Sequence, residues 1–237
     1  MKVIFCDNDI IVCHKERGEL SECADESAKD SLPRQLGDYL AENGQKNIHV
    51  FAVHRLDRET EGVMVYARNS RAAAALSKSI CEGKLQKTYL ALCHGEVFPD
   101  SDHLCDLLYY DRKRGKSFVV TRERNGVRKA ELDYKVIERK NGFSLLEIKL
   151  ITGRTHQIRV QFASRKHPLV ADRRYGAPKS EHEQLGLLAK TLTFPHPTTG
   201  EIVTFECDSG LCPKNLQGSA LDPFRTLPRH LAHEFHP

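Results

Sequence analysis

Residues 143–165, FSLLEIKLITGRTHQIRVQFASR, decide the fold because their periodicity changes partway along. Apolar and charged side chains alternate at first, so Leu146 and Ile148 share one face of an extended chain. Beyond a glycine the spacing becomes helical, and Phe162 follows Ile158 by one turn. The segment therefore predicts a strand, a sharp turn and a helix.

Outward from this segment, strands dominate and helices are inserted singly. Residues 2–18 predict two short strands that turn at Asp7–Asp9, and apolar runs at 63–67 and 87–95 predict two more. Helical patterns occupy 32–43 and 71–80. This order predicts one α+β domain over residues 1–210, with a mixed, mostly antiparallel sheet flanked by helices and loops. Residues 211–237 contain four prolines and are expected to form a C-terminal extension.

The composition is that of an ordinary folded domain. The chain has 237 residues, of which 40% are hydrophobic, and a formal charge of +4, which permits a nucleic-acid partner without requiring one. Its eight cysteines are scattered and do not form the two closely spaced pairs typical of a structural zinc site. Neither a signal peptide nor a run of about 20 apolar residues, enough to span a bilayer, occurs. We expect a cytoplasmic protein without a membrane segment or a metal site.

The stretch VHRLDRETEGVMVYARN, residues 53–69, sets one carboxylate, Asp57, between Arg55 and Arg58. In an extended chain Arg55 and Asp57 share one face, because side chains alternate. A surface ion pair is one interpretation, and such a pair contributes only about 0–1 kcal/mol. A carboxylate held between cations because it does chemistry is the other. The spacing alone favours the surface pair.

A second candidate site is the turn in ITGRTHQIRV, residues 151–160. Gly153 permits a sharp turn, Thr155 is a possible N-cap, and the helix that follows offers free amide donors for an anion. Arg154 lies where a strand end commonly projects a functional side chain. The alternative is a helix cap with a solvated arginine, in which Gln157 and Arg159 also face solvent.

Tyr89 interrupts an otherwise apolar strand in QKTYLALCHG, with Lys87 two residues earlier on the same face. A buried tyrosine usually packs with its hydroxyl satisfied. In an enzyme that acts on nucleic acid, its ring would instead stack on an extruded base.

Residues 111–129 carry a local excess of positive charge. Phosphate contact and a merely solvated hairpin both explain this run. Its basic residues are Arg112, Lys113, Arg114, Lys116, Arg122, Arg124, Arg128 and Lys129. Three terminal histidines, His230, His233 and His236, do not predict a metal site, because they lie in a proline-containing tail.

Motifs for nucleotide or zinc chemistry do not occur in the sequence: it has no glycine-rich phosphate loop and no H-E-x-x-H. The residues alone therefore predict a basic, cofactor-free domain with one possible carboxylate site.

Five motifs occur in a fixed order: HRLDRETEG, KTYLAL, TGRTHQIRVQF, HPLVADRRYG and TFPHPTTGEIVTF. Together, from about Val3 to Phe205, they resemble the pseudouridine synthases of the RluA family, the large-ribosomal-subunit type. This resemblance implies that residues 1–210 form a pseudouridine synthase catalytic domain. The family breaks the bond between base and sugar of a uridine in RNA and rejoins the ribose to carbon 5 of the base. No metal or cofactor is implied.

The resemblance also assigns roles to residues. Asp57 matches the catalytic aspartate, Arg154 the arginine that pairs with it and keeps it ionised, Tyr89 the tyrosine that stacks on the target base, and Arg55 the residue that helps displace the target nucleotide. The partner implied is a stem-loop of rRNA or tRNA, bound by a monomer. Further residues expected to bind the RNA are His54, Arg58, Lys87, Thr155, His156, Gln157 and Arg159.

Some positions depart from the family pattern. Glu61 replaces a usual serine, Leu188 a usual histidine and Ala171 a common glycine before Asp172, and KERGEL replaces the usual lysine-proline-x-glycine-leucine. The additional N-terminal RNA-binding domain of many relatives is not expected, since the hairpin-like start is at residue 3. The departures motivate an alternative hypothesis, a catalytically impaired RNA-binding or ribosome-assembly factor on the same fold.

Overall fold

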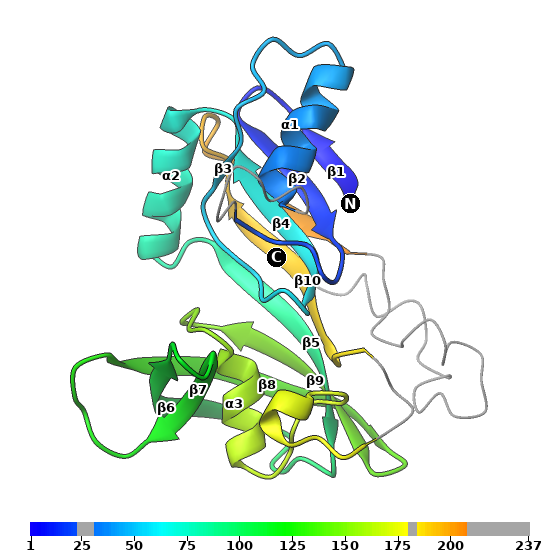
Figure 1. The fold of residues 1–237 in the computed structure, drawn as a ribbon, viewed down its shortest axis with the longest axis vertical. Coiled ribbons are helices and arrows are strands. Elements are labelled where there is room, and N and C mark those ends of the chain that lie inside the picture. Colours follow the sequence, from blue (N-terminus) through cyan, green and yellow to red (C-terminus); the bar gives the residue numbers. More distant parts are fainter. Residues whose placement is uncertain (23–30, 180–183, 208–237) are drawn as a thin grey trace.

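The computed structural model describes residues 1–22, 31–179 and 184–207 (Figure 1). The expected extension at 211–237 and its histidines lie outside these residues. Within the described ranges, no helix is long and apolar enough to cross a membrane.

One mixed sheet forms the framework of the molecule. Its strands, in chain order, are β1 (Lys2–Cys6), β2 (Ile10–Lys15), β3 (Phe51–Ala52), β4 (Glu61–Ala67), β5 (Gln86–His94), β6 (Ser101–Asp111), β7 (Lys116–Val120), β8 (Val127–Lys140), β9 (Phe143–Leu150), β10 (Leu187–Pro195) and β11 (Ile202–Glu206). The helices are α1 (Leu32–Glu42), α2 (Ser70–Cys81), α3 (Gln157–Ser164) and a short 3-10 turn, η1 (Arg173–Tyr175).

Among the described residues the strands pair in the order β1-β2-β4-β10-β5-β9-β8-β6-β7, with β11 added beside β10 and β3 beside β4. Every pair is antiparallel except β4 with β10, where Glu61 and Gly62 lie opposite Leu188 and Ala189 in parallel register. The expected α+β fold with a mixed, mostly antiparallel sheet is therefore confirmed. β10 joins the part of the sheet that carries α1 and α2 to the part that carries α3 (Figure 1).

Two helices cover opposite faces of β2 and β4, which explains why these strands are apolar at consecutive positions. In β2, Ile11 belongs to the core cluster that contains the α1 leucines, whereas Ile10 belongs to the cluster that contains Leu76 of α2. Pro33 near the start of α1 suits a first helical turn, and the side chain of Asn69 accepts a hydrogen bond from the Ala72 amide to cap α2. The expected hairpin and both helices are confirmed at these positions.

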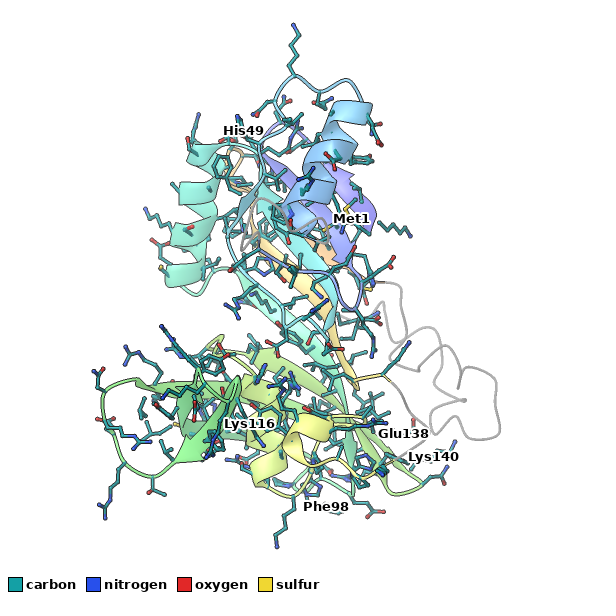
Figure 2. All side chains as sticks on the ribbon, in the orientation of Figure 1. Met1, His49, Phe98, Lys116, Glu138 and Lys140 are labelled. Atoms are coloured by element: carbon teal, nitrogen blue, oxygen red, sulfur yellow. The ribbon has the colours of Figure 1, made fainter. Side chains whose placement is uncertain are left out.

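The basic run at 111–129 forms the outer edge of the other half of the sheet. We call it the basic arm: it comprises the end of β6, all of β7 and the first residues of β8. Seven of its eight basic residues are exposed and Lys116 is half-buried. Figure 2 shows Lys116 on this edge. Helix α3 packs behind β7, so the basic arm lies close to the turn that carries the second candidate site.

Candidate active site

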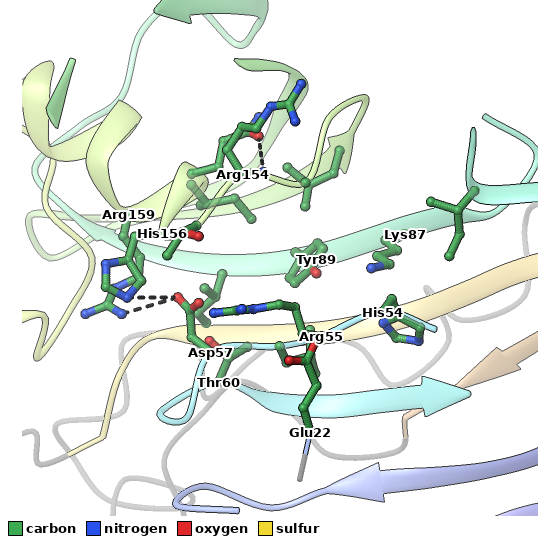
Figure 3. A pocket seen from close by; sticks show the side chains of 18 of the residues that line it. Glu22, His54, Arg55, Asp57, Thr60, Lys87, Tyr89, Arg154, His156 and Arg159 are labelled. Carbon is green, nitrogen blue, oxygen red and sulfur yellow. Dashed lines mark hydrogen bonds and ion pairs between the residues drawn. The ribbon is translucent and has the colours of Figure 1, made fainter. Parts of the chain in front are cut away.

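A cavity of about 440 Å³ opens where the loop before β4, strand β5 and the turn before α3 meet. Figure 3 shows Asp57, His156 and Arg159 at one end of this pocket and Lys87 with His54 at the other. The lining contains every residue expected at the site except Arg58. Residues from separate parts of the chain are thus brought together as the sequence predicted.

A buried lysine binds the backbone of the loop that carries Asp57. Lys15, at the end of β2, donates hydrogen bonds from Nζ to the carbonyl oxygens of Glu16 at 3.0 Å, Arg58 at 3.0 Å and Thr60 at 2.8 Å. Its side chain is fully buried, and burial lowers its pKa from 10.5 to about 8. Sequence reasoning missed this residue because a lysine at a strand end ordinarily points to solvent.

A buried arginine bridges two aspartates at one end of the pocket (Figure 3). Arg159 of α3 donates from Nη1 to Oδ2 of Asp57 at 3.3 Å, and from Nε and Nη2 to the two carboxylate oxygens of Asp172 at 2.7 and 2.8 Å. Burial alone would lower the pKa of Arg159, but the hydrogen bonds and charges of Asp172 and Asp57 raise it. The guanidinium therefore stays charged and makes strong, charge-assisted hydrogen bonds.

This geometry corrects the expected pairing of Arg154 with Asp57. Arg154 lies on the pocket lining but is exposed, and its Nε donates to the carbonyl oxygen of Lys129 at 3.0 Å. The chain reverses at His156 before the helix begins, so a residue inside α3 faces the carboxylate and the strand-end residue does not. In the described structure, the cation in contact with Asp57 is Arg159.

The turn itself differs from the expectation in its start and its cap. Helix α3 begins at Gln157, and its N-cap is His156 rather than Thr155. His156, not Gly153, adopts the left-handed conformation, with φ of 55°. The side chain of Gln157 stabilises the turn, since its Oε1 accepts from the Arg154 amide at 3.0 Å and its Nε2 donates to the Glu131 carbonyl at 3.0 Å.

Tyr89 lies on the wall of the pocket beside Asp57 (Figure 3). It is 5% exposed, and burial together with the charge of Asp57 raises its pKa, so the phenol is neutral. Its neighbour on the same face, Lys87, also lines the pocket, and burial lowers the pKa of this lysine to about 8. The predicted common face of Lys87 and Tyr89 is confirmed.

At the far end of the pocket, His54 is buried and neutral. Its Nε2 accepts a hydrogen bond from the Val65 amide at 3.2 Å, which assigns the ring proton to Nδ1. Burial, with a smaller effect from the charge of Lys87, lowers the pKa of His54 well below 6.5. The Nδ1 atom is buried and has no hydrogen-bond partner among the described residues.

The other expected RNA-binding residues divide into two groups. Arg55 is exposed, and its side chain extends from the loop toward Asp57 (Figure 3). Thr155 lines the cavity. Arg58, by contrast, turns away and donates from Nε to the Gly18 carbonyl at 3.0 Å. This contact supports the loop, and Arg58 does not line the cavity.

The two most prominent departures from the family pattern, Glu61 and Leu188, lie directly opposite each other in the pairing of β4 with β10. Leu188 is buried in the apolar cluster beneath α2. Glu61 forms an ion pair with Arg17 at 3.1 Å, so its charge is offset by a residue of the KERGEL segment, itself a departure. Neither side chain lines the pocket.

Asp172, which anchors Arg159, is 2% exposed and was not singled out as a site residue. It follows Ala171, whose φ is 58°. This left-handed conformation suits glycine and costs an L-residue about 1–2 kcal/mol. The backbone conformation at position 171 therefore explains why glycine is common there, and alanine at this position lowers the stability of the folded protein.

Comparison with known proteins defines the class. A family model described as RNA pseudouridylate synthase matches residues 9–164, and the chain belongs to this family of isomerases that act on RNA. It is 32% identical to the RNA pseudouridine synthase YlyB of Bacillus subtilis over 87% of this chain and 68% of that one. It is 33% identical to ribosomal large subunit pseudouridine synthase D of Neisseria meningitidis over 87% of this chain and 57% of that one.

Solved structures share the fold. Human RNA pseudouridylate synthase domain containing 1 aligns with a TM-score of 0.71 at 23% identity, over 88% of this chain and 83% of that one. Human RNA pseudouridylate synthase domain containing 4 gives the same TM-score at 22% identity, over 88% of both chains. The resemblance read from the sequence motifs is confirmed at the level of family and fold.

Proposed function

We propose that this protein isomerises specific uridines of rRNA or tRNA to pseudouridine, with Asp57 as the nucleophile. The observation that carries the proposal is the placement of the Asp57 carboxylate, held by Arg159 inside a cavity that Tyr89 also lines. A volume of about 440 Å³ is within the usual range for a site that encloses a small ligand, such as one extruded nucleotide.

The reaction needs no group from outside the substrate. The bond between C1′ and N1 breaks and a bond between C1′ and C5 forms, while C5 loses a proton and N1 gains one. Asp57 supplies the negative charge that acts on the target nucleotide, and the ring of Tyr89 stacks on its base. Arg55 helps displace the nucleotide and occupies its place in the RNA.

RNA binding is assigned to the pocket rim and the basic arm. Arg154 is exposed beside the cavity, and the basic arm continues from it along β7 and β8. These cations would contact phosphates on either side of an extruded nucleotide. We further propose that the protein acts as a monomer in the cytoplasm. Residues 1–210 would form the catalytic domain.

The second candidate is an RNA-binding or ribosome-assembly factor that does not catalyse the reaction. It is motivated by the departures at Glu61 and Leu188. Their positions favour the enzyme, because the charge of Glu61 is offset by Arg17 and neither side chain reaches the cavity.

A pair of matched variants tests the proposal. Asp57→Asn and Glu59→Gln each replace one carboxylate of the same loop by an amide, but only Asp57 lines the pocket. RNA from a strain lacking this protein, complemented with each variant, is mapped for pseudouridine. We expect Glu59→Gln to restore the missing sites and Asp57→Asn to restore none, while the variant still binds RNA. If the strain lacks no pseudouridine, the assembly factor is the better assignment.

A further inference from the structure

A chain of hydrogen bonds leads from the basic arm to the edge of the pocket. The hydroxyl oxygen of Tyr175, in η1, lies 2.8 Å from the amide nitrogen of Ser117 in β7 and 2.9 Å from Nδ1 of His156. Both Tyr175 and Ser117 are buried, at 8% and 2% exposure. Tyr175 and Ser117 have no part in the reaction proposed above, and His156 has so far been named only as a residue expected to bind the RNA.

The donors and acceptors in this chain can be assigned from chemistry. The Ser117 amide can only donate, so the tyrosine oxygen accepts from it. Among the described residues, the single hydroxyl hydrogen of Tyr175 is then paired only if it points to Nδ1 of His156. A neutral imidazole that accepts at Nδ1 carries its proton on Nε2. This arrangement pairs both the Ser117 amide and the Tyr175 hydroxyl hydrogen.

The protonated nitrogen faces the reacting carboxylate. Nε2 of His156 lies 3.8 Å from Oδ2 of Asp57, which is too long for a hydrogen bond. The His156 ring lies on the cavity lining, and it stands edge-on to the Tyr175 ring at 5.7 Å. The Nε2–H group is therefore directed beside Asp57 and remains available to a bound molecule.

We propose that Tyr175 is a positioning residue, whose hydroxyl fixes His156 as the tautomer with its proton on Nε2 so that His156 donates a hydrogen bond to the target nucleotide beside Asp57. The part that concerns the nucleotide rests on the proposed function, whereas the tautomer does not.

The charges around His156 agree with a neutral ring. Burial lowers its pKa below 6.5, Asp57 opposes this effect, and Arg159 and Arg174 reinforce it, with Asp172 a weaker opposing charge. A further cation, Lys116 of β7, lies 4.8 Å from the centre of the Tyr175 ring. Donation from Tyr175 to Nδ1 also favours the neutral form, because a protonated ring cannot accept there.

The test is nitrogen NMR on the full chain labelled with ¹⁵N-histidine. The signal of His156 is assigned by its loss in His156→Gln. At neutral pH the wild type should show His156 protonated on Nε2 alone. Tyr175→Phe keeps the ring but removes the hydroxyl, so a mixture of tautomers and a raised His156 pKa are expected. Tyr134→Phe, which removes a hydroxyl bound to the Pro99 carbonyl, should leave His156 unchanged.

Four outcomes separate the parts of the inference. A wild-type His156 protonated on Nδ1 would overturn it, even if Tyr175→Phe failed to fold. An unchanged tautomer in folded Tyr175→Phe would overturn the role of Tyr175. In an active enzyme, kcat of Tyr175→Phe should fall about ten- to hundredfold with KM little changed, and an unaltered kcat would refute donation to the nucleotide. A wild type without activity would count against the proposed function while leaving the tautomer measurement decisive.

Discussion

Replacing Arg159 by lysine tests which arginine holds the Asp57 carboxylate. The guanidinium makes two hydrogen bonds to Asp172, at 2.7 and 2.8 Å, and one to Asp57 at 3.3 Å. A lysine ammonium is a point charge without the planar fork, so it cannot keep all three contacts. Because Asp172 accepts the two shorter bonds, we expect the lysine to remain with Asp172 and to release Asp57.

The magnitude follows from the contact that is lost. A hydrogen bond to a charged group contributes about 1.5–3 kcal/mol, which corresponds to a loss of roughly 10- to 150-fold in kcat if the contact persists in the transition state. The matched control is Arg154→Lys, at an exposed side chain bound to a backbone carbonyl. We expect its kcat to stay within about threefold of the wild type, while KM for RNA rises, because surface contacts contribute little to the chemical step.

The assay uses release of tritium from RNA that contains [5-³H]uridine, since C5 loses its hydrogen when pseudouridine forms. Single-turnover conditions separate the chemical step from RNA binding, and thermal melting confirms that each variant is folded. The assignment of Arg159 would be wrong if Arg154→Lys lost as much activity as Arg159→Lys, or if Arg159→Lys stayed within about threefold of the wild type.

Three further changes probe the surroundings of the pocket. Lys15→Met leaves three backbone carbonyls without their donor and should lower the free energy of unfolding in urea by about 2–4 kcal/mol; a loss below about 1 kcal/mol would contradict its support of the loop. Ala171→Gly relieves a φ of 58° and should raise that free energy by about 0.5–1 kcal/mol, whereas Ala163→Gly inside α3 should lower it by about 1 kcal/mol. The pKa of buried His54 is far below 6.5 in the folded protein. As the pH falls, His54 is therefore protonated in the unfolded chain before it is protonated in the folded one. Stability should therefore decrease below pH 6.5 by up to about 1.4 kcal/mol per pH unit, and melting of His54→Gln between pH 5 and 7 should lack this component.

The ion pair of Arg17 with Glu61 illustrates how the structure changes the meaning of a sequence feature. Read along the chain, Glu61 adds a negative charge four residues after Asp57, where it would repel a phosphate. In the fold, the Glu61 carboxylate pairs with Arg17, 44 positions earlier, and Glu61 does not line the cavity. The negative charge of Glu61 therefore forms a contact between β4 and the segment that directly follows β2, where it does not oppose RNA binding.

Sequence by itself determined the elements and the inventory of the pocket. Alternation in residues 143–150 and helical spacing in 32–43 and 71–80 are local patterns, so the strands and helices follow from them. The family motifs placed Asp57, Tyr89 and Lys87 at one site, and the cavity contains all three. Local periodicity and motif order are sufficient for such conclusions because they do not depend on distant partners.

Only the tertiary structure decided which side chains touch. Arg159 contacts Asp57 across 102 residues of sequence, and the choice between Arg159 and Arg154 depends on the left-handed backbone at His156, which no spacing rule indicates. Lys15 and Tyr175 are likewise defined by contacts with loops and strands far along the chain. The physical reason is common to these cases: a buried charge or hydroxyl takes the partner that the sheet register and the turn geometry bring within hydrogen-bond distance.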